Sequence, residues 1–278
     1  MLHKTHKHIK QLKIQGAENI STAAILAMQH EIKKSEDYRK ASENAMKKLV
    51  TARPTEPQLE NYLYYINEYA KNYPKSETLR EIKQILKEKK LIRNKIFQNG
   101  SKLIKNKMTI FTHCHSSTVI GTLKKSKKKF QVYNTETRPI LQGRKTSKEL
   151  AKARIPVTHF IDSASRIALK DSDIMLLGAD SITHNRVYNK IGSELMALTA
   201  KNYSVPVYIC SSLWKFNNHR ETIEERPISE VWKRPPKGVK VKNFAFEKIS
   251  FKLIKGIICE EGILKPKKFV KRARKILL

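Results

Sequence analysis

The chain has 278 residues, with 57 Lys and Arg against 25 Asp and Glu, which gives a formal net charge of +32. A hydrophobic content of 40% is enough for a sizeable core, while no apolar run is long enough to span a bilayer and the first residues lack the apolar segment of a signal peptide. Cys114, Cys210 and Cys259 are too few and too scattered for a disulfide framework, so we expect a soluble cytoplasmic protein with reduced thiols and no membrane association.

Residues 1–101 have the apolar spacing of helices. The segment Ile20–Met28 is rich in alanine and apolar, and later stripes recur at helical spacing, as in Leu59, Leu63, Ile66 and Ala70. Breaks are expected before Pro54 and at Pro74, because the residue before a proline avoids helical geometry. We therefore predict a helical domain over residues 1–101, which ends near the sequence Asn-Gly-Ser at 99–101.

Residues 102–278 alternate between short apolar runs and helical segments. The expected strands are Met108–Phe111, Phe130–Tyr133, Pro156–Ile161, Ile174–Leu177 and Val207–Cys210, and helices are expected to begin near 119, 147, 163 and 192. Leu253–Cys259 could form one more strand, and Pro266–Leu278 a basic terminal helix. The alternation predicts an α/β fold, in which a Rossmann-like doubly wound parallel sheet follows the helical domain.

The segment Met108–Gly121 predicts a buried strand, a loop and the start of a helix. In a parallel sheet, a loop that follows a strand lies on the ligand-binding edge, and the N-terminus of the next helix suits a phosphate. Ser116, Ser117 and Thr118 add hydroxyl groups there. Cys114 is either an activated thiol or a small buried hydrophobe. The flanking histidines have no third ligand nearby, so we expect no metal site.

Other polar residues follow the later strands. Asp180, after the strand Ile174–Leu177, would share an edge with Cys114, where it could act as its acid–base partner or cap the next turn. Arg138 could bind an anion or form a structural ion pair. Three further residues could bind phosphate or hydroxyl groups of a ligand, namely Asn189, Lys190 and Lys215, although each is a weak signal alone.

The net charge favours anionic ligands. Lysines are spread along the chain, with a local run at Lys124–Lys129 and a basic tail at Lys265–Lys275. No zinc-finger spacing, RRM-type aromatic motif or clear helix-turn-helix is present, so a nucleic-acid interaction would be a nonspecific, salt-sensitive attraction to RNA. An anionic substrate or a generally basic surface explains the charge equally well.

Taken together, the motifs THCHSSTV, TETRPILQGRKTSKEL, DSASR, GADSIT, NKIG and WKF resemble one family. It joins the alpha, beta and delta type subunits of initiation factor 2B with ribose-1,5-bisphosphate isomerase and methylthioribose-1-phosphate isomerase. The resemblance runs from about Lys10 to the segment EEGILKP and is dense from Thr112 to Phe216. It implies a helical N-terminal domain, a Rossmann-like C-terminal domain, and homodimers or larger assemblies built mainly through the latter.

The resemblance also implies a catalytic pair. Cys114 and Asp180 stand at the motif positions of the cysteine and aspartate that the isomerases use, so the chain looks most like ribose-1,5-bisphosphate isomerase. The implied reaction converts ribose 1,5-bisphosphate to ribulose 1,5-bisphosphate without a metal or redox cofactor. Cys114 would move a proton at carbon and Asp180 would serve the sugar oxygens, or the roles would be reversed. The substrate contacts implied by the same match are Gly16, Ala17, Arg53, Ser116, Ser117, Thr118, Asn189, Lys190 and Lys215.

One stretch departs from the isomerases. Their Arg-Gly-Ala-Gly loop, which helps to hold a phosphate, is matched here by Gln15, Gly16, Ala17 and Glu18. An arginine is lost and a carboxylate is gained where an anion should bind, which weakens the expected phosphate site by about 1.5–3 kcal/mol. This stretch favours the alternative interpretation, a non-catalytic initiation-factor-2B-like regulatory subunit in translation initiation.

Overall fold

The computed structural model describes residues 1–218 and 224–277, and its first part is helical. A proline or a short polar turn separates most of the five helices: α1 (Leu2–Lys10), α2 (Ala17–Lys34), α3 (Tyr38–Val50), α4 (Pro57–Asn72) and α5 (Lys75–Ser101). Their apolar faces form one core, around Ile25, Leu49 and Leu63. The expected breaks before Pro54 and at Pro74 are confirmed by the ends of α3 and α4.

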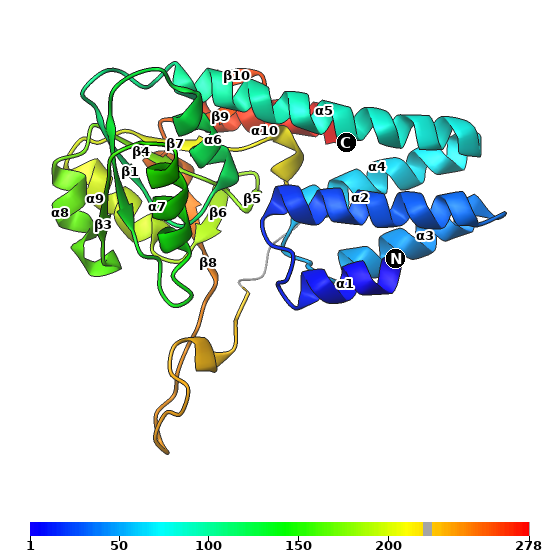
Figure 1. Ribbon diagram of the computed structural model, residues 1–278, viewed down its shortest axis with the longest axis horizontal. Coiled ribbons are helices and arrows are strands. Elements are labelled where there is room, and N and C mark those ends of the chain that lie inside the picture. The colour runs from blue at the N-terminus through cyan, green and yellow to red at the C-terminus, as the bar shows by residue number, and fades with distance from the viewer. Residues whose placement is uncertain (219–223, 278) are drawn as a thin grey trace.

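Helix α5 connects the two parts of the molecule. Figure 1 shows it running from the helical bundle across the edge of the sheet. Its C-terminal turns pack on α6 (Ser117–Lys125), where Gly121 is needed because a side chain there would overlap the Phe97 ring. Helix α5 ends at Ser101, close to the proposed boundary, but the division into domains at 101/102 stays a prediction.

The second part is built on a seven-stranded sheet. Its order is β10-β9-β7-β4-β1-β2-β3, in which only β10 is antiparallel to its neighbour. The strands are β1 (Thr109–Thr112), β2 (Gln131–Thr135), β3 (Val157–Phe160), β4 (Ile174–Leu177), β7 (Val207–Cys210), β9 (Gly256–Cys259) and β10 (Gly262–Leu264). The chain order reverses between β1 and β4, which makes this the switch point where doubly wound sheets bind ligands.

Helices cover both faces of this sheet. One core joins α5, α6 and α7 (Gln142–Lys152) through strand residues such as Ile110 and Leu176. The other joins α8 (Ser165–Lys170), α9 (Ser193–Asn202) and α10 (Pro266–Leu277) through residues such as Phe111 and Leu177. Adjacent strand residues thus alternate between the two cores, as the period of a β-strand requires. The predicted α/β class with a preceding helical region is confirmed.

A smaller antiparallel sheet was not predicted. It contains β5 (Ser181–Ile182), β6 (Arg186–Lys190) and β8 (Phe246–Ser250), and β6 ends with Asn189 and Lys190. The chain before β8 forms an arm that extends away from the body in Figure 1 and carries the 3-10 turn Ile228–Glu230. The expected terminal helix is α10, while Leu278 lies outside the described residues.

None of the helices in residues 1–218 and 224–277 is long and apolar enough to cross a membrane.

Candidate active site

A cavity lies where the carboxyl ends of β1 and β4 meet the helical part. The loops after these two strands supply one wall, and the N-terminal ends of α2 and α4 supply another. Almost all residues expected at the site line it: Gly16, Ala17, Arg53, Cys114, Ser116, Ser117, Thr118, Asp180, Asn189, Lys190 and Lys215. Segments more than 150 positions apart in the sequence therefore contribute to one cavity.

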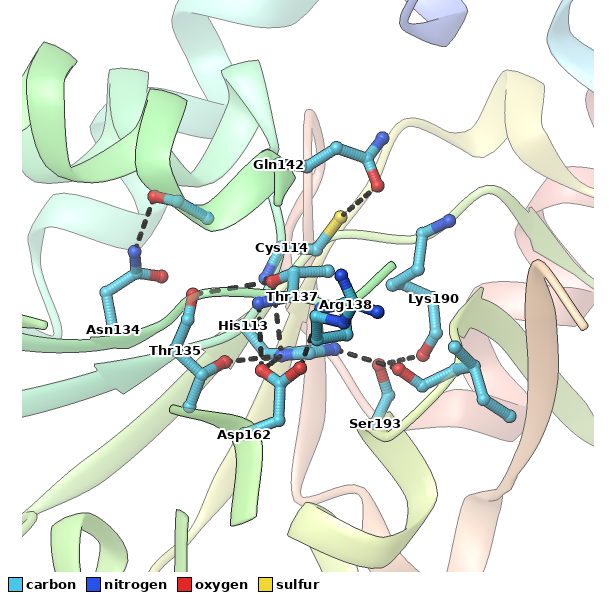
Figure 2. Close-up of polar contacts among 12 residues, drawn as sticks. His113, Cys114, Asn134, Thr135, Thr137, Arg138, Gln142, Asp162, Lys190 and Ser193 are labelled. Carbon is cyan, nitrogen blue, oxygen red and sulfur yellow. Dashed lines mark hydrogen bonds and ion pairs between the residues drawn. The ribbon is translucent and has the colours of Figure 1, made fainter. Parts of the chain in front are cut away.

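Cys114 is held in a defined orientation at the end of β1. Its backbone is left-handed, with φ of 69°, and its N–H donates to the hydroxyl of Thr137 at 2.9 Å. The hydroxyl of Thr146 donates to the Cys114 carbonyl at 2.8 Å. The thiol points at Gln142 and donates to its amide oxygen at 3.6 Å (Figure 2). Burial raises the pKa of the thiol to about 11, although Lys190 opposes the shift.

His113, beside the cysteine, is a structural residue. It is 2% exposed, and burial lowers its pKa, so the imidazole is neutral. Its Nε2 donates to the carbonyl of Ile191 at 2.9 Å, which leaves Nδ1 to accept from the Thr135 hydroxyl at 2.5 Å. Figure 2 shows this network beneath Cys114, where it connects the ends of β1 and β2 with the segment before α9.

The segment Ser116–Thr118 forms the N-terminus of α6 at the cavity wall. Ser116 is the N-cap residue, and its hydroxyl accepts from the N–H of Val119 at 3.3 Å. Gly178, after β4, lies so close that a Cβ there would come 2.6 Å from the Ser116 hydroxyl. Ser117 and Thr118 also line the cavity, and the N-terminus of a helix at such a position suits an anion.

Asp180 follows β4 and faces several cations. Burial raises its pKa, while Lys215, Lys190 and Arg53 oppose the shift. Lys215 Nζ is held by the carbonyl of Ala179 at 2.5 Å, and Lys190 Nζ lies 5.1 Å from the centre of the Phe246 ring. The arrangement can present a carboxyl group and two ammonium groups to the same ligand.

Asn189 completes this wall of the cavity. Its amide donates to the hydroxyl of Ser193 at 3.0 Å, and that hydroxyl donates to the carbonyl of Lys190 at 2.6 Å. Ser193 begins α9, so the contact fixes the end of β6 against the start of this helix.

Two carboxylates flank Arg53. Its Nε lies 3.8 Å from Glu56 Oε1, and its Nη2 lies 3.5 Å from Glu224 Oε2. Glu56 lines the cavity and is 3% exposed, and sequence reasoning missed it. The only signal was a glutamate three residues after Arg53, at the start of a helix.

The cavity wall near Gly16 holds an ion pair. Glu18 accepts from Lys89 Nζ and from the Gln58 amide, each at 3.2 Å. Lys89 is 2% exposed, donates to Ser21 at 2.8 Å and lies over the Tyr62 ring. Sequence reasoning missed Lys89, although a lysine within the apolar stripe of α5 was a usable signal.

Arg138 does not reach the cavity. Its side chain is exposed and lies near the carbonyls of Pro139 and Val231, and its backbone N–H donates to Asp162 at 2.7 Å. In the parts of the chain that the structure describes, no three His, Cys, Asp or Glu residues are grouped so that they could hold a metal ion.

Comparison with known proteins gives matches over nearly the whole chain. A model of the initiation factor 2 subunit family matches residues 13–266. Ribose 1,5-bisphosphate isomerase of Thermococcus kodakarensis is 37% identical over 93% of this chain and 89% of its own length. Methylthioribose-1-phosphate isomerase of Heliobacterium modesticaldum is 30% identical, over 93% of this chain and 86% of its own length. The solved structure of translation initiation factor eIF-2B from Pyrococcus horikoshii OT3 has the same fold, with a TM-score of 0.85 and 23% identity over 96% of this chain and 98% of that one.

Proposed function

Because the chain belongs to the initiation factor 2 subunit family and is a sugar-phosphate isomerase of the aldose–ketose type, we propose that it converts ribose 1,5-bisphosphate to ribulose 1,5-bisphosphate. The observation that carries the proposal is the placement of Cys114 and Asp180 on one cavity, at the ends of the two strands that flank the switch point. A thiol and a carboxyl group there can move protons at neighbouring atoms of a sugar.

Two regions of the cavity suit phosphate groups. The N-terminus of α6 with Ser116, Ser117 and Thr118 offers N–H and hydroxyl donors. Lys190 and Lys215 offer positive charge on the wall next to Asp180. A sugar with a phosphate at each end would place its reacting carbons between these two regions, next to Cys114.

The reaction requires four proton movements. The ring oxygen must gain a proton as its bond to C1 breaks, C2 must lose one, O2 must lose one, and C1 must gain one. Asp180 would protonate the ring oxygen and, once ionised, take the proton from O2. Cys114 would take the proton from C2 and return it to C1. Each residue ends in its starting state, so protons balance without any other reactant.

The state of Cys114 affects the expected pH dependence. Burial raises the pKa of the thiol to about 11, so the resting residue is protonated and must ionise before it can take a proton from C2. The positive charge of Lys190 favours that ionisation. We therefore expect kcat/KM to rise with pH for as long as Asp180 keeps the proton that it gives to the ring oxygen, and to stop rising once Asp180 ionises.

The test is a turnover assay with ribose 1,5-bisphosphate and, in parallel, methylthioribose 1-phosphate. We expect turnover of the bisphosphate, and we expect Cys114→Ser and Asp180→Asn each to lower kcat by about 10³-fold or more while substrate still binds. Turnover of only the monophosphate would reassign the substrate. Binding without turnover of either sugar by the folded wild-type protein would favour the regulatory-subunit alternative, which Glu18 in the cavity supports.

We further propose that the protein is a homodimer that works in the cytoplasm. Large apolar side chains are exposed on the outer face of α8 and α9, among them Ile167 at 62%, Leu195 at 64% and Leu198 at 48%. A partner subunit would cover them. The expected nonspecific attraction to RNA stays a prediction from charge, and its nearest structural counterpart is the basic outer face of α10.

A further inference from the structure

Three of the cations that line the cavity are paired with glutamates. Arg53, Lys89 and Arg226 each form an ion pair with at least one glutamate. Arg93, on helix α5, lines the same cavity but forms no ion pair with a carboxylate in residues 1–218 and 224–277. Its buried Nε also has no hydrogen-bond partner among these residues. A buried N–H without an acceptor is costly, so packing alone does not explain this arginine.

Phe97 holds Arg93 beside helix α6. The guanidinium carbon Cζ of Arg93 lies 5.9 Å from the centre of the Phe97 ring, which is one turn further along α5. The same ring packs on Gly121 of α6, where an added Cβ would come 2.1 Å from it. Ser117 and Thr118, at the start of α6, line the cavity together with Arg93. The arginine therefore adds its positive charge to a helix end that already suits an anion.

The face of α5 that borders the cavity carries a second cation. Lys89 is four positions before Arg93, so the two side chains lie on the same face of the helix. Glu18 neutralises Lys89 across 3.2 Å, but none of the described carboxylates does the same for Arg93. Gln15, which lines the same cavity, is uncharged. This end of the cavity therefore keeps a net positive charge, which a bound anion would compensate.

We propose that Arg93 binds one of the two phosphate groups of the substrate, at the end of the cavity between α5 and the N-terminus of α6. The inference rests on the proposed function, because a bisphosphate would place one phosphate there and the other near Lys190 and Lys215. A planar guanidinium group matches the oxygens of a phosphate, and the Nε of Arg93 has no internal acceptor to give up first. Arg93 thereby makes the protein selective for a sugar that carries a second phosphate.

The first test measures affinity without turnover, by calorimetry with ribose 1,5-bisphosphate in the Cys114→Ser background. Arg93→Met removes the charge but keeps an unbranched side chain that can still pack on Phe97. We expect it to weaken binding of the bisphosphate by roughly 10- to 100-fold, as the loss of an arginine–phosphate pair implies. Arg93→Lys keeps the charge without the planar fork of donors, so it should lose less affinity than Arg93→Met.

Arg80→Met is the matched control. It makes the same change on the same helix, at an exposed position that does not line the cavity, and should leave the affinity unchanged. Without ligand, Arg93→Met should unfold at no lower a temperature than its parent, because it removes a donor that has no acceptor. A destabilised Arg93→Met that binds the bisphosphate normally would assign the arginine a structural role and overturn the inference.

The second test uses two ligands that each lack one phosphate, ribose 1-phosphate and ribose 5-phosphate. If Arg93 contacts one phosphate, Arg93→Met should weaken binding of the sugar that carries it by about tenfold or more and leave the other within about twofold. An equal loss for both monophosphates would mean that the substitution disturbs the cavity as a whole, which would overturn the inference.

The inference and the proposed function fail separately. If the wild type turns over the bisphosphate and Arg93→Met binds it as tightly as its parent does, only the inference fails. If the wild type turns over no sugar phosphate, the proposed function fails, while a loss of bisphosphate affinity in Arg93→Met would still support the phosphate site. A parent protein that does not bind the bisphosphate at all would overturn both.

Discussion

The ammonium group of Lys89 lies 3.2 Å from the carboxylate of Glu18, and both side chains line the cavity beside Gly16 and Ala17. The pair joins helices α2 and α5, and only 2% of Lys89 is exposed. Because Glu18 neutralises the lysine, this end of the cavity offers an anion less positive charge than its composition suggests.

Glu18→Gln should tighten binding of a bisphosphate. The substitution removes a negative charge from the cavity and frees Lys89 to approach a phosphate. We expect KM for ribose 1,5-bisphosphate to fall about five- to tenfold, which corresponds to roughly 1 kcal/mol. Steady-state kinetics would show this, with Glu31→Gln on the same helix as the control. An increased KM would mean that Glu18 itself contacts the sugar.

Because of Lys89, the free energy of unfolding of the protein should rise as the solution becomes alkaline. Burial lowers the pKa of Lys89 to about 8, below that of an unfolded-state lysine. Between these values the unfolded state binds more protons, so the free energy of unfolding rises with pH, by about 2 kcal/mol between pH 8 and 9.5. Urea unfolding should show this rise in wild type and a flatter profile in Lys89→Met. Parallel profiles in the two proteins would contradict the prediction.

Glu56 should lower stability above neutral pH. Its pKa is about 7 in the folded protein, so its favourable contribution is complete below the unfolded value near 4.5 and is lost as the pH rises through 7. Glu56→Gln should therefore be more stable than wild type at pH 8, by up to about 3 kcal/mol, with a smaller gain at pH 5.5. Thermal unfolding at both pH values measures the difference. Equal gains at the two values would show that the carboxyl group does not titrate in this range.

The backbone at Cys114 should favour glycine over alanine. Its φ of 69° is in the left-handed region, which side chains with a Cβ adopt only at a cost. We expect Cys114→Gly to be more stable than Cys114→Ala by about 1 kcal/mol, the reverse of the usual order. Chemical denaturation of the two variants compares them directly. A more stable alanine variant would show that the loop relaxes when the thiol is removed.

The exposed apolar face of α9 should mediate self-association. Leu195→Glu would place a charge in the proposed interface, and we expect it to convert the dimer to a monomer in sedimentation experiments. Leu91→Glu is the matched control, because Leu91 is also exposed, at 51%, but lies on α5. A wild-type protein that sediments as a monomer would contradict the proposed dimer.

Local sequence patterns are sufficient to predict the main elements and one side of the cavity. Apolar runs followed by helical segments predict β1 and β4, and residues that follow adjacent parallel strands must meet at one edge. The pattern therefore places Cys114 and Asp180 on the same edge of the sheet. The N-terminal helices are predictable for the same reason, since their apolar stripes repeat at helical spacing.

The groups that face this edge depend on how the two parts of the chain pack together. Glu56 precedes α4 and Lys89 lies in α5, and the sequence pattern of these helices does not indicate that they face the sheet. Arg138 lies close in sequence to other site residues, but its side chain does not reach the cavity. Their roles depend on burial and on charges from distant segments, such as Glu18 beside Lys89 and the charge of Asp180, which raises the pKa of Glu56. Electrostatic interactions act through space in a low-dielectric interior, so they follow the three-dimensional arrangement rather than the order of residues along the chain.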